Sequence, residues 1–537
     1  MTEHDATLST DYLVIGAGSA GCVVAARLSE DGHSKVTLLE AGKRDTNPWI
    51  HIPIGYGKTI VNPDVNWRFE TEKGPEIADR PMYWARGRVL GGSSSINGLL
   101  YIRGQAADYD QWRQMGNTGW SYEDVLPYFR KAEDQENGAD TYHGSGGPLR
   151  VSNLVERNPL CEAFIASGVA AGIPRNDDFN GAGQEGIGYY QLTTRKARRC
   201  SAAVAYLRPA RARPNLRVET EAVVERILFD GKRAVGCEFR RGGRLIRIRA
   251  SREVILCAGS IKSPHLLLLS GVGPAVQLTQ NGIPVVHDLP GVGENLQDHY
   301  GAILTYRSKL PLTINDLMTS RWQQVKAGLQ YALMRRGPLT ISAAQAGAFV
   351  RSSPHVDAPD IQFLFQTFSH DEYDEGLHNF SGFANVVCPL RPESRGRLSL
   401  RSSDPNTAPL MQPNYLSART DRTLLVEALK IARKVAQQPQ IAAHITEEYA
   451  PGRHTVSDAE LLDYARRTGL SIAHQVGTCK MGTDPMAVVD PTLQVRGLDG
   501  LRVVDASVMP TLISGNTNAP TIMIAEKGAD MIKEDAA

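Results

Sequence analysis

Gly16-Ala17-Gly18-Ser19-Ala20-Gly21 stands between an apolar segment, Tyr12 to Ile15, and an alanine- and valine-rich stretch, Cys22 to Ser29. This order predicts a buried strand, a tight turn and a helix, and Val36 to Leu39 predicts a second strand. The first glycine permits the sharp turn, the second lets backbone amides approach a pyrophosphate, and the third lets the helix pack closely on the strand. The start of the chain therefore predicts a dinucleotide-binding βαβ unit in an α/β fold.

Glu40 ends the second predicted strand, where a carboxylate can accept both ribose hydroxyls of an adenosine. It would repel a 2′-phosphate, so NADP is disfavoured. Amides at the helix start are expected to bind the phosphates. The turn alone does not separate FAD from NAD, because both present the same adenosine diphosphate. The cofactor contacts predicted in this region are Gly16, Gly18, Ser19, Ala20, Gly21, Glu40 and Ala41.

The composition excludes several classes of partner. A chain of 537 residues exceeds one usual core, so two domains are expected, and they can interleave. Lys plus Arg (59) nearly balances Asp plus Glu (58), and no basic run contains interleaved aromatics, so nucleic acid is not expected. A small, uncharged substrate fits better.

The cysteine pattern and the N-terminus bear on location. The seven cysteines are scattered and form no C-x-x-C pair, which argues against a disulfide framework and against a metal site. Met1 to Asp11 is polar and acidic, without the pattern of an export signal. No apolar run is long enough to span a membrane. We therefore expect a cytoplasmic protein.

Two later segments also predict strands that end at polar or small residues. Val254 to Cys257 runs into Ala258 and Gly259, and Leu501 to Val504 ends at Asp505. Ligands of open α/β sheets lie at the carboxyl ends of the strands. Arg307 to Leu400, by contrast, alternates short apolar runs with turns, which predicts an antiparallel sheet with flanking helices. Helices are expected at Ser263 to Leu269, Thr420 to Gln437 and Ser457 to Arg467.

Six motifs in order resemble the glucose-methanol-choline (GMC) oxidoreductase family. Arg86 to Gly98 (RGRVLGGSSSING) resembles its first signature and Gly259 to Gly273 (GSIKSPHLLLLSGVG) its second. The likeness continues over residues 294–299, 474–482, 505–507 and 514–521, and so covers nearly the whole chain. Bacterial choline, aliphatic alcohol and sorbose dehydrogenases of that family look most similar.

The resemblance implies FAD and a Rossmann-type FAD-binding domain with an interleaved α+β substrate-binding domain. The FAD-binding domain is expected to combine residues 1–155, 215–305 and 466–537. Residues 156–214 and 306–465 are expected to form the substrate-binding domain, an antiparallel sheet plus helices.

The resemblance also implies further FAD contacts. Small residues after Leu90 let backbone lie against a flat ring system, and Val223 is expected to hold adenine through its backbone. Relatives that tether FAD covalently carry histidine where this chain has Ile96, so non-covalent FAD is expected. The implied contacts are Arg86, Val89, Gly91, Gly92, Ser93, Asn97, Gly98, Leu99, Leu100, Val223, Ala258, Gly259, Asp505, Ala506, Asn518, Pro520 and Thr521.

Removing hydride from a neutral alcohol requires a base for the hydroxyl proton, and a neutral imidazole can supply one. The family places its base at the position of His474 and a second active-site residue at the position of Asn518, whose amide can donate to a developing alkoxide. The implied reaction is hydride transfer from CH–OH to flavin N5. His299 is interpreted as structural, and Pro520 and Thr521 are expected to open a helix over Ile522 to Ile532.

The substrate and acceptor are less defined. Choline-specific relatives carry glutamate where this chain has Gln345, and a neutral amide cannot pair a buried cation, so a neutral primary or polyhydroxylated alcohol is expected. Phe363, Phe365 and Phe368 either line the substrate pocket or, the simpler interpretation, pack in a sheet core. We expect a quinone, a redox protein or O2 as electron acceptor.

Three alternatives remain open on the sequence alone. They are an NAD-linked dehydrogenase, a redox-silent FAD protein such as a lyase, and a non-catalytic binding module. Delivery of electrons to a membrane quinone would need peripheral docking, and no amphipathic anchor stands out in the sequence, so membrane association also stays open.

Overall fold

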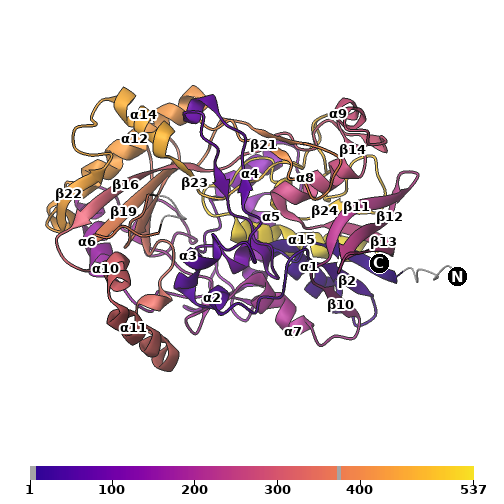
Figure 1. The fold of residues 1–537 in the computed structure, drawn as a ribbon, viewed down its shortest axis with the longest axis horizontal. Helices are drawn as coiled ribbons and strands as arrows, with labels where there is room; N and C mark the ends of the chain where they lie inside the picture. Colours follow the sequence, from indigo (N-terminus) through magenta and orange to yellow (C-terminus); the bar gives the residue numbers. More distant parts are fainter. Residues whose placement is uncertain (1–7, 372–375, 537) are drawn as a thin grey trace.

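The computed structural model describes residues 8–371 and 376–536. Two seven-stranded sheets lie at opposite ends of the molecule, with helices between and around them (Figure 1). Residues 1–7, most of the segment used to argue against an export signal, lie outside the described residues. No helix of the described ranges is long and apolar enough to cross a membrane.

The first sheet combines three distant parts of the chain. Its order is β10-β2-β1-β13-β12-β11, and β24 also pairs with β13. Pairing is parallel from β10 to β13 and to β24, and antiparallel among β13, β12 and β11. All four predicted strands are present: β2 has the predicted limits, β1 and β13 begin earlier than predicted, and β24 is one residue shorter. The strands are β1 (Leu8–Ile15), β2 (Val36–Leu39), β10 (Leu216–Glu219), β11 (Val223–Asp230), β12 (Arg233–Arg241), β13 (Arg244–Leu256) and β24 (Leu501–Val503).

The first and last helices pack on each other beside this sheet. α1 (Ser19–Leu28) contacts α15 (Asn518–Asp535), and α5 (Tyr122–Ala132) covers α15 from another side (Figure 1). Arg27 of α1 pairs with the fully buried Glu526 of α15 at 2.7 Å between Nε and Oε2. This contact ties the two ends of the chain together.

α15 is longer at both ends than the sequence predicted. It begins at Asn518 because Pro520, which lacks an N–H, is tolerated in a first turn where amides have no intrahelical acceptor. It continues to Asp535, and its last turn carries the ion pairs Lys533–Glu30 and Arg502–Asp535. α8 (Gly259–Leu269) likewise begins earlier than predicted.

The second sheet is antiparallel throughout, as predicted. Its order is β22-β16-β19-β18-β17-β7, and β23 pairs with the start of β16. α6 (Pro159–Ala170), α12 (Arg419–Ala436) and α14 (Asp458–Thr468) pack on it. The strands are β7 (Gly186–Tyr189), β16 (Tyr300–Ser308), β17 (Ala346–Val350), β18 (Ile361–Gln366), β19 (Gly382–Pro389), β22 (Ile445–Ala450) and β23 (Leu470–Ser471).

Two of the predicted segment boundaries fall inside elements. The boundary at 305/306 cuts β16, all of which pairs within the second sheet. The boundary at 465/466 cuts α14, which the Ser457 capping box starts as predicted. The point where the chain passes between sheets therefore lies before Tyr300 and after Ser471.

Two helices project from the second sheet. α10 (Ile314–Thr319) and α11 (Arg321–Met334) lie at the outer edge of the molecule, at the lower left in Figure 1. Their inner sides face the cavity described next.

Candidate active site

A cavity of about 700 Å³ lies between the two sheets. One part is lined by the β1–α1 turn, the end of β2, residues 85–87, 92–93 and 96–100, and the start of α8. The other part is lined by α10, α11 and the even-numbered residues from Leu364 to His370. His474 and the start of α15 line the same cavity as the β1–α1 turn, so both ends of the chain contribute to one site.

The predicted glycine turn has the geometry expected of a nucleotide-binding loop. Gly16 has φ +98°, and a Cβ on Gly21 would lie 1.8 Å from the Gly16 carbonyl oxygen. A Cβ on Gly92 would come within 2.7 Å of the Gly18 Cα. The glycines at 16, 21 and 92 are therefore required by backbone packing alone.

Gly18 is different, and it points to a ligand. Its φ of −79° suits any residue, and a Cβ there would meet only the Cys257 carbonyl oxygen at 3.9 Å. Gly18 lines the cavity directly before α1, whose first amides have no intrahelical acceptor. A phosphate approaching this backbone accounts for the glycine, so the cradle fits the pyrophosphate of FAD.

Glu40 is buried at the end of β2 and is held by backbone amides. Its carboxylate accepts from Ala17 N (2.9 Å) and Gly42 N (2.8 Å), which leaves lone pairs on both oxygens for ribose hydroxyls. Burial raises the pKa of Glu40 to about 7, against the effect of these two hydrogen bonds. The residue is thus oriented for the predicted role.

Most of the predicted cofactor residues line the cavity, and four do not. Gly21 packs on Gly16, and Val89 is buried with Ile50, Val65 and Ile96. Gly91 and Pro520 are also absent from the lining. The lining includes Gly16, Gly18, Ser19, Ala20, Glu40, Ala41, Arg86, Gly92, Ser93, Asn97, Gly98, Leu99, Leu100, Val223, Ala258, Gly259, Asp505, Ala506, Asn518 and Thr521.

Asp505 joins loops in addition to lining the cavity. Its carboxylate accepts from Gly259 N (2.8 Å), Ser263 Oγ (2.6 Å) and Ser507 N (2.8 Å). It therefore fixes the start of α8 against the turn that follows β24, and its side chain has little capacity left for a ligand.

The sequence interpretation missed Arg199. It is 1% exposed, and its guanidinium donates to Asn97 Oδ1 (2.6 Å) and to the carbonyl oxygens of Ser94 (3.1 Å) and Asn97 (2.8 Å). It thus holds the loop between the two parts of the cavity. Its position, far from the first signature in the sequence, gave no signal.

His474 is held by a chain of neutral hydrogen bonds. His299 Nε2 lies 2.9 Å from the Leu390 carbonyl oxygen, which can only accept, so Nε2 carries the proton and Nδ1 is an acceptor. His474 Nδ1 lies 2.8 Å from His299 Nδ1 and must donate to it. The His474 Nε2 atom is then left as an acceptor, with a lone pair that can take a proton. His299, interpreted as structural from the sequence, sets the tautomer of the predicted base.

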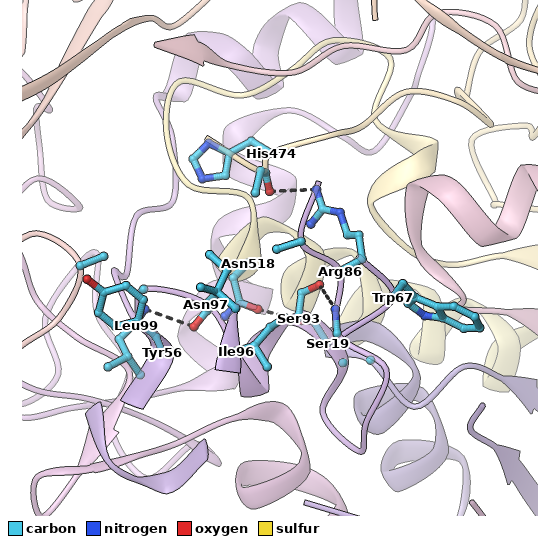
Figure 2. Close-up of a pocket in the computed structure, with 18 of the residues that line it drawn as sticks. Ser19, Tyr56, Trp67, Arg86, Ser93, Ile96, Asn97, Leu99, His474 and Asn518 are labelled. Atoms are coloured by element: carbon cyan, nitrogen blue, oxygen red, sulfur yellow. Dashed lines mark hydrogen bonds between the residues drawn. The ribbon is translucent and has the colours of Figure 1, made fainter. Parts of the chain in front are cut away.

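Asn516 is the amide that contacts His474. Its Nδ2 lies 3.1 Å from His474 Nε2, and its Oδ1 accepts from Gln362 Nε2 (3.2 Å), which fixes the amide orientation. Asn518 lies below His474 in the same pocket, and its Oδ1 accepts from Ser19 Oγ at 2.8 Å (Figure 2). Nothing in the sequence signalled Asn516 apart from its nearness to Asn518.

The loop that carries His474 is fixed by charged groups. Arg86 donates to the Ala473 carbonyl oxygen at 2.9 Å (Figure 2), and Ala473 has φ +62°. Asp298 accepts from the backbone N of His474 at 2.7 Å and from Gln475 Nε2 at 2.8 Å. Among the described residues the buried Arg86 Nε has no hydrogen-bond partner.

Burial keeps both imidazoles neutral. It holds the pKa of His474 well below its ordinary value, and the positive charge of Arg86 acts in the same direction. Burial also lowers the pKa of His299 to about 4, against the effect of its hydrogen bond to Leu390. Both rings are therefore neutral at neutral pH, each with a proton on one nitrogen only.

The two predicted substrate-pocket residues do not line the cavity. Side chains alternate across β18 and its extension, so Leu364, Gln366 and Phe368 face the cavity, whereas Phe365 stacks on Phe164 at 4.3 Å between centroids. Phe363 is also buried in the core, and only Phe368 of the three aromatics lines the cavity.

Gln345 is likewise buried away from the cavity. Its amide donates to the Glu156 carbonyl oxygen (3.1 Å) and accepts from Thr367 Oγ1 (3.5 Å) and, weakly, from Cys161 Sγ. The argument for a neutral substrate therefore cannot rest on this residue.

The nucleotide cradle, the apolar second part of the cavity and the neutral imidazole between them define an oxidoreductase that binds a dinucleotide cofactor. Models of the GMC oxidoreductase N- and C-terminal regions match residues 10–301 and 392–525. The chain belongs to the GMC oxidoreductase family, which confirms the resemblance found in the sequence. It is an FAD-dependent enzyme with the predicted α/β fold.

Curated relatives cover nearly the whole chain. A protein named alcohol dehydrogenase (acceptor) from Pseudomonas putida is 44% identical, over 97% of this chain and 95% of its own. Human mitochondrial choline dehydrogenase is 45% identical, over 97% of this chain and 89% of its own. Among solved structures, pyridoxine 4-oxidase from Mesorbium loti is 32% identical with a TM-score of 0.87, covering 97% of this chain and 98% of its own.

Proposed function

We propose that the protein oxidises the CH–OH group of a neutral primary or polyhydroxylated alcohol, with non-covalently bound FAD and with His474 as the base. A quinone or another acceptor other than NAD then takes the electrons. The observation that carries this proposal is the His299–His474 chain, which turns an unprotonated Nε2 toward the cavity. Names of both alcohol-oxidising relatives support the substrate class.

In this proposal His474 accepts the hydroxyl proton of the alcohol. An alcohol whose O–H donates to His474 Nε2 replaces Asn516 as the partner of that lone pair. The Asn516 amide, still held by Gln362, can then donate to the alcohol oxygen and stabilise negative charge there. In this position Asn516 performs the task that the sequence gave to Asn518.

FAD, when bound, supplies the two-electron acceptor for the hydride that leaves the carbinol carbon. The β1–α1 turn would hold its pyrophosphate, Glu40 its ribose and the loop at Gly92 to Leu100 its ring system. Ile96 lines the cavity with an alkyl side chain, which cannot form a covalent link, and this supports dissociable FAD. Asn518 and Ser19 bond to each other beside this loop.

The charge of the cavity supports a neutral alcohol over choline. Among the described lining residues the cations are Lys58, Arg86 and Lys262, and the carboxylates are Glu40 and Asp505, both engaged by backbone amides. The part around α10 is lined mostly by apolar side chains, among them Leu317, Met318, Leu364 and Phe368, and also by the polar Gln324, Gln366 and His370. Choline is the second candidate because four of its dehydrogenases are 41–45% identical to this chain.

Two alternatives of the same fold concern the electrons. An alcohol oxidase would pass them to O2, an idea supported by the likeness to pyridoxine 4-oxidase. A redox-silent FAD enzyme such as a lyase would not need an acceptor. The family assignment leaves an NAD-linked dehydrogenase or a simple binding module without support.

One experiment ranks these possibilities. The visible flavin band of the purified protein is followed while hexanol, benzyl alcohol or choline is added without oxygen. We expect hexanol or benzyl alcohol to bleach the band, and air alone to restore it slowly. His474→Ala should keep the band and slow its bleaching at least about 100-fold. An unchanged band in the wild type favours an FAD protein that does not oxidise alcohols. If choline bleaches the band as fast as hexanol does, the neutral-substrate proposal is contradicted.

A further inference from the structure

The outer face of α11 exposes a row of large apolar side chains. Trp322 is 74% exposed, Leu329 56% and Leu333 82%, and Val325 is exposed beside them. At 100° per residue these four positions lie within about 80° of the helix circumference. The opposite face holds the buried Ala327 and Tyr331. The helix therefore presents an apolar surface to solvent as well as to the core.

This surface continues onto its neighbours and is surrounded by positive charge. Met318 of α10 is 49% exposed, and Met334 at the end of α11 is exposed. Residues 321–336 contain no Asp or Glu. The basic side chains are exposed, and none forms an ion pair with a described residue; they are Arg321, Lys326, Arg335 and Arg336.

The same two helices form a wall of the active-site cavity. Leu317 and Met318 of α10 and Gln324 and Gly328 of α11 line it. Met318 is both half-exposed and part of the lining, so it marks a mouth of the cavity next to the apolar row.

We propose that α10 and α11 form a docking surface that seats the protein on an anionic lipid bilayer. Exposed tryptophan and leucine flanked by Lys and Arg are typical of helices that lie in a membrane interface. Four cations that form no ion pair with the described residues favour anionic headgroups over a second copy of this chain, which would bring the same positive charge. The mouth at Met318 then opens toward the lipid, so apolar alcohols dissolved in the bilayer reach His474 without crossing water.

The test uses FAD-loaded protein and vesicles of phosphatidylcholine with roughly 30% phosphatidylglycerol, the anionic component. Binding is measured by co-sedimentation without any alcohol, so it does not depend on the proposed reaction. Trp322→Ser/Leu333→Ser should weaken binding at least about tenfold. Lys326→Gln/Arg336→Gln should weaken it about fivefold per charge, and only when phosphatidylglycerol is present.

Matched controls remove exposed residues of the same kinds elsewhere. Val276→Ser/Val456→Ser, two exposed valines on other elements, and Arg211→Gln/Arg244→Gln should bind vesicles like the wild type. Lipids with a bromine quencher should quench fluorescence in the wild type and less in Trp322→Phe. Equal vesicle binding by wild type and Trp322→Ser/Leu333→Ser overturns the proposal. The proposal is also overturned if the wild type is a dimer, Trp322→Ser/Leu333→Ser is a monomer, and neither protein binds vesicles.

A separate arm tests the route to the active site, which rests on the proposed function. Vesicles should accelerate oxidation of dodecanol by the wild type and not by Trp322→Ser/Leu333→Ser, while both oxidise hexanol equally in buffer. If neither protein oxidises any alcohol, the proposed function fails and the docking result still stands.

Discussion

His299 offers the sharpest test of how the active site prepares its base. The ring touches neither cavity nor cofactor loop, yet it accepts the Nδ1 proton of His474 at 2.8 Å. Replacing it with leucine leaves that N–H buried without a partner, which costs about 1–3 kcal/mol. The tautomer with its proton on Nε2 becomes competitive, and in that form the ring cannot accept the alcohol proton.

The magnitude follows from this cost. About 1–3 kcal/mol corresponds to roughly a 5- to 150-fold slower anaerobic bleaching of the flavin band by hexanol. His299→Gln is the matched control, because its Nε2 can donate to Leu390 and its Oε1 can accept from His474. We expect the glutamine variant to react within about fivefold of the wild type, and both variants to hold FAD fully.

A pH profile separates positioning from general damage. The ratio of the two tautomers of a neutral imidazole does not change with pH, so His299→Leu should lower the reduction rate by the same factor throughout the neutral and alkaline range. The reasoning is refuted if His299→Leu bleaches as fast as the wild type, or if His299→Gln is as slow as the leucine variant while both are folded and loaded with FAD.

Four further predictions follow from the site. Gly18→Ala should leave the thermal stability of the FAD-free protein unchanged, since its Cβ meets only an atom 3.9 Å away, but weaken FAD binding at least about tenfold in a fluorescence titration; normal affinity would contradict the phosphate cradle. FAD affinity should be highest above pH 7 and fall below it, because binding favours the ionised Glu40 whose pKa is about 7 without FAD, and Glu40→Gln should flatten this dependence. Arg86→Met removes a charge that lowers the pKa of His474, so the acid limb of the reduction rate should move to higher pH, and an unmoved limb would exclude that role. Burial lowers the pKa of His299 to about 4 in the folded protein, so its contribution to the free energy of unfolding is fully present above pH 6.5 and falls by about 3 kcal/mol toward pH 4; urea unfolding of His299→Gln should lack this contribution.

The fold was largely predictable because its signals are local. The glycine turn, the apolar strands and the Ser457 capping box each act within a few residues, and each appears where predicted. The limits of elements were less predictable. α15 continues past Ile532, where Lys533 pairs with Glu30 and Asp535 pairs with Arg502, and both partners lie outside α15 in the sequence.

The substrate part of the site was predicted less well for a different reason. Alternation along β18 was visible, but the face of each residue depends on sheet pairing far along the chain. The sequence prediction was wrong by one residue along the strand: Phe365 lies in the core, and its neighbours Leu364 and Gln366 face the cavity. The exposed apolar row of α11 was not predicted, because the helix carries apolar residues on both faces, which removes the one-sided pattern of an amphipathic helix.

His474 donates its Nδ1–H to a neutral imidazole, that of His299, and this explains how His474 remains able to accept a proton. A carboxylate at Nδ1 would orient the ring equally well but would raise its pKa, and the ring would then be protonated near neutral pH. A carboxylate is close, but Asp298 accepts the backbone N–H of His474 and side-chain donors instead. His299 orients the imidazole without adding negative charge, and burial keeps both rings neutral. A base this weak gains little by taking the alcohol proton alone, so in the proposed reaction the proton and the hydride should leave the alcohol together.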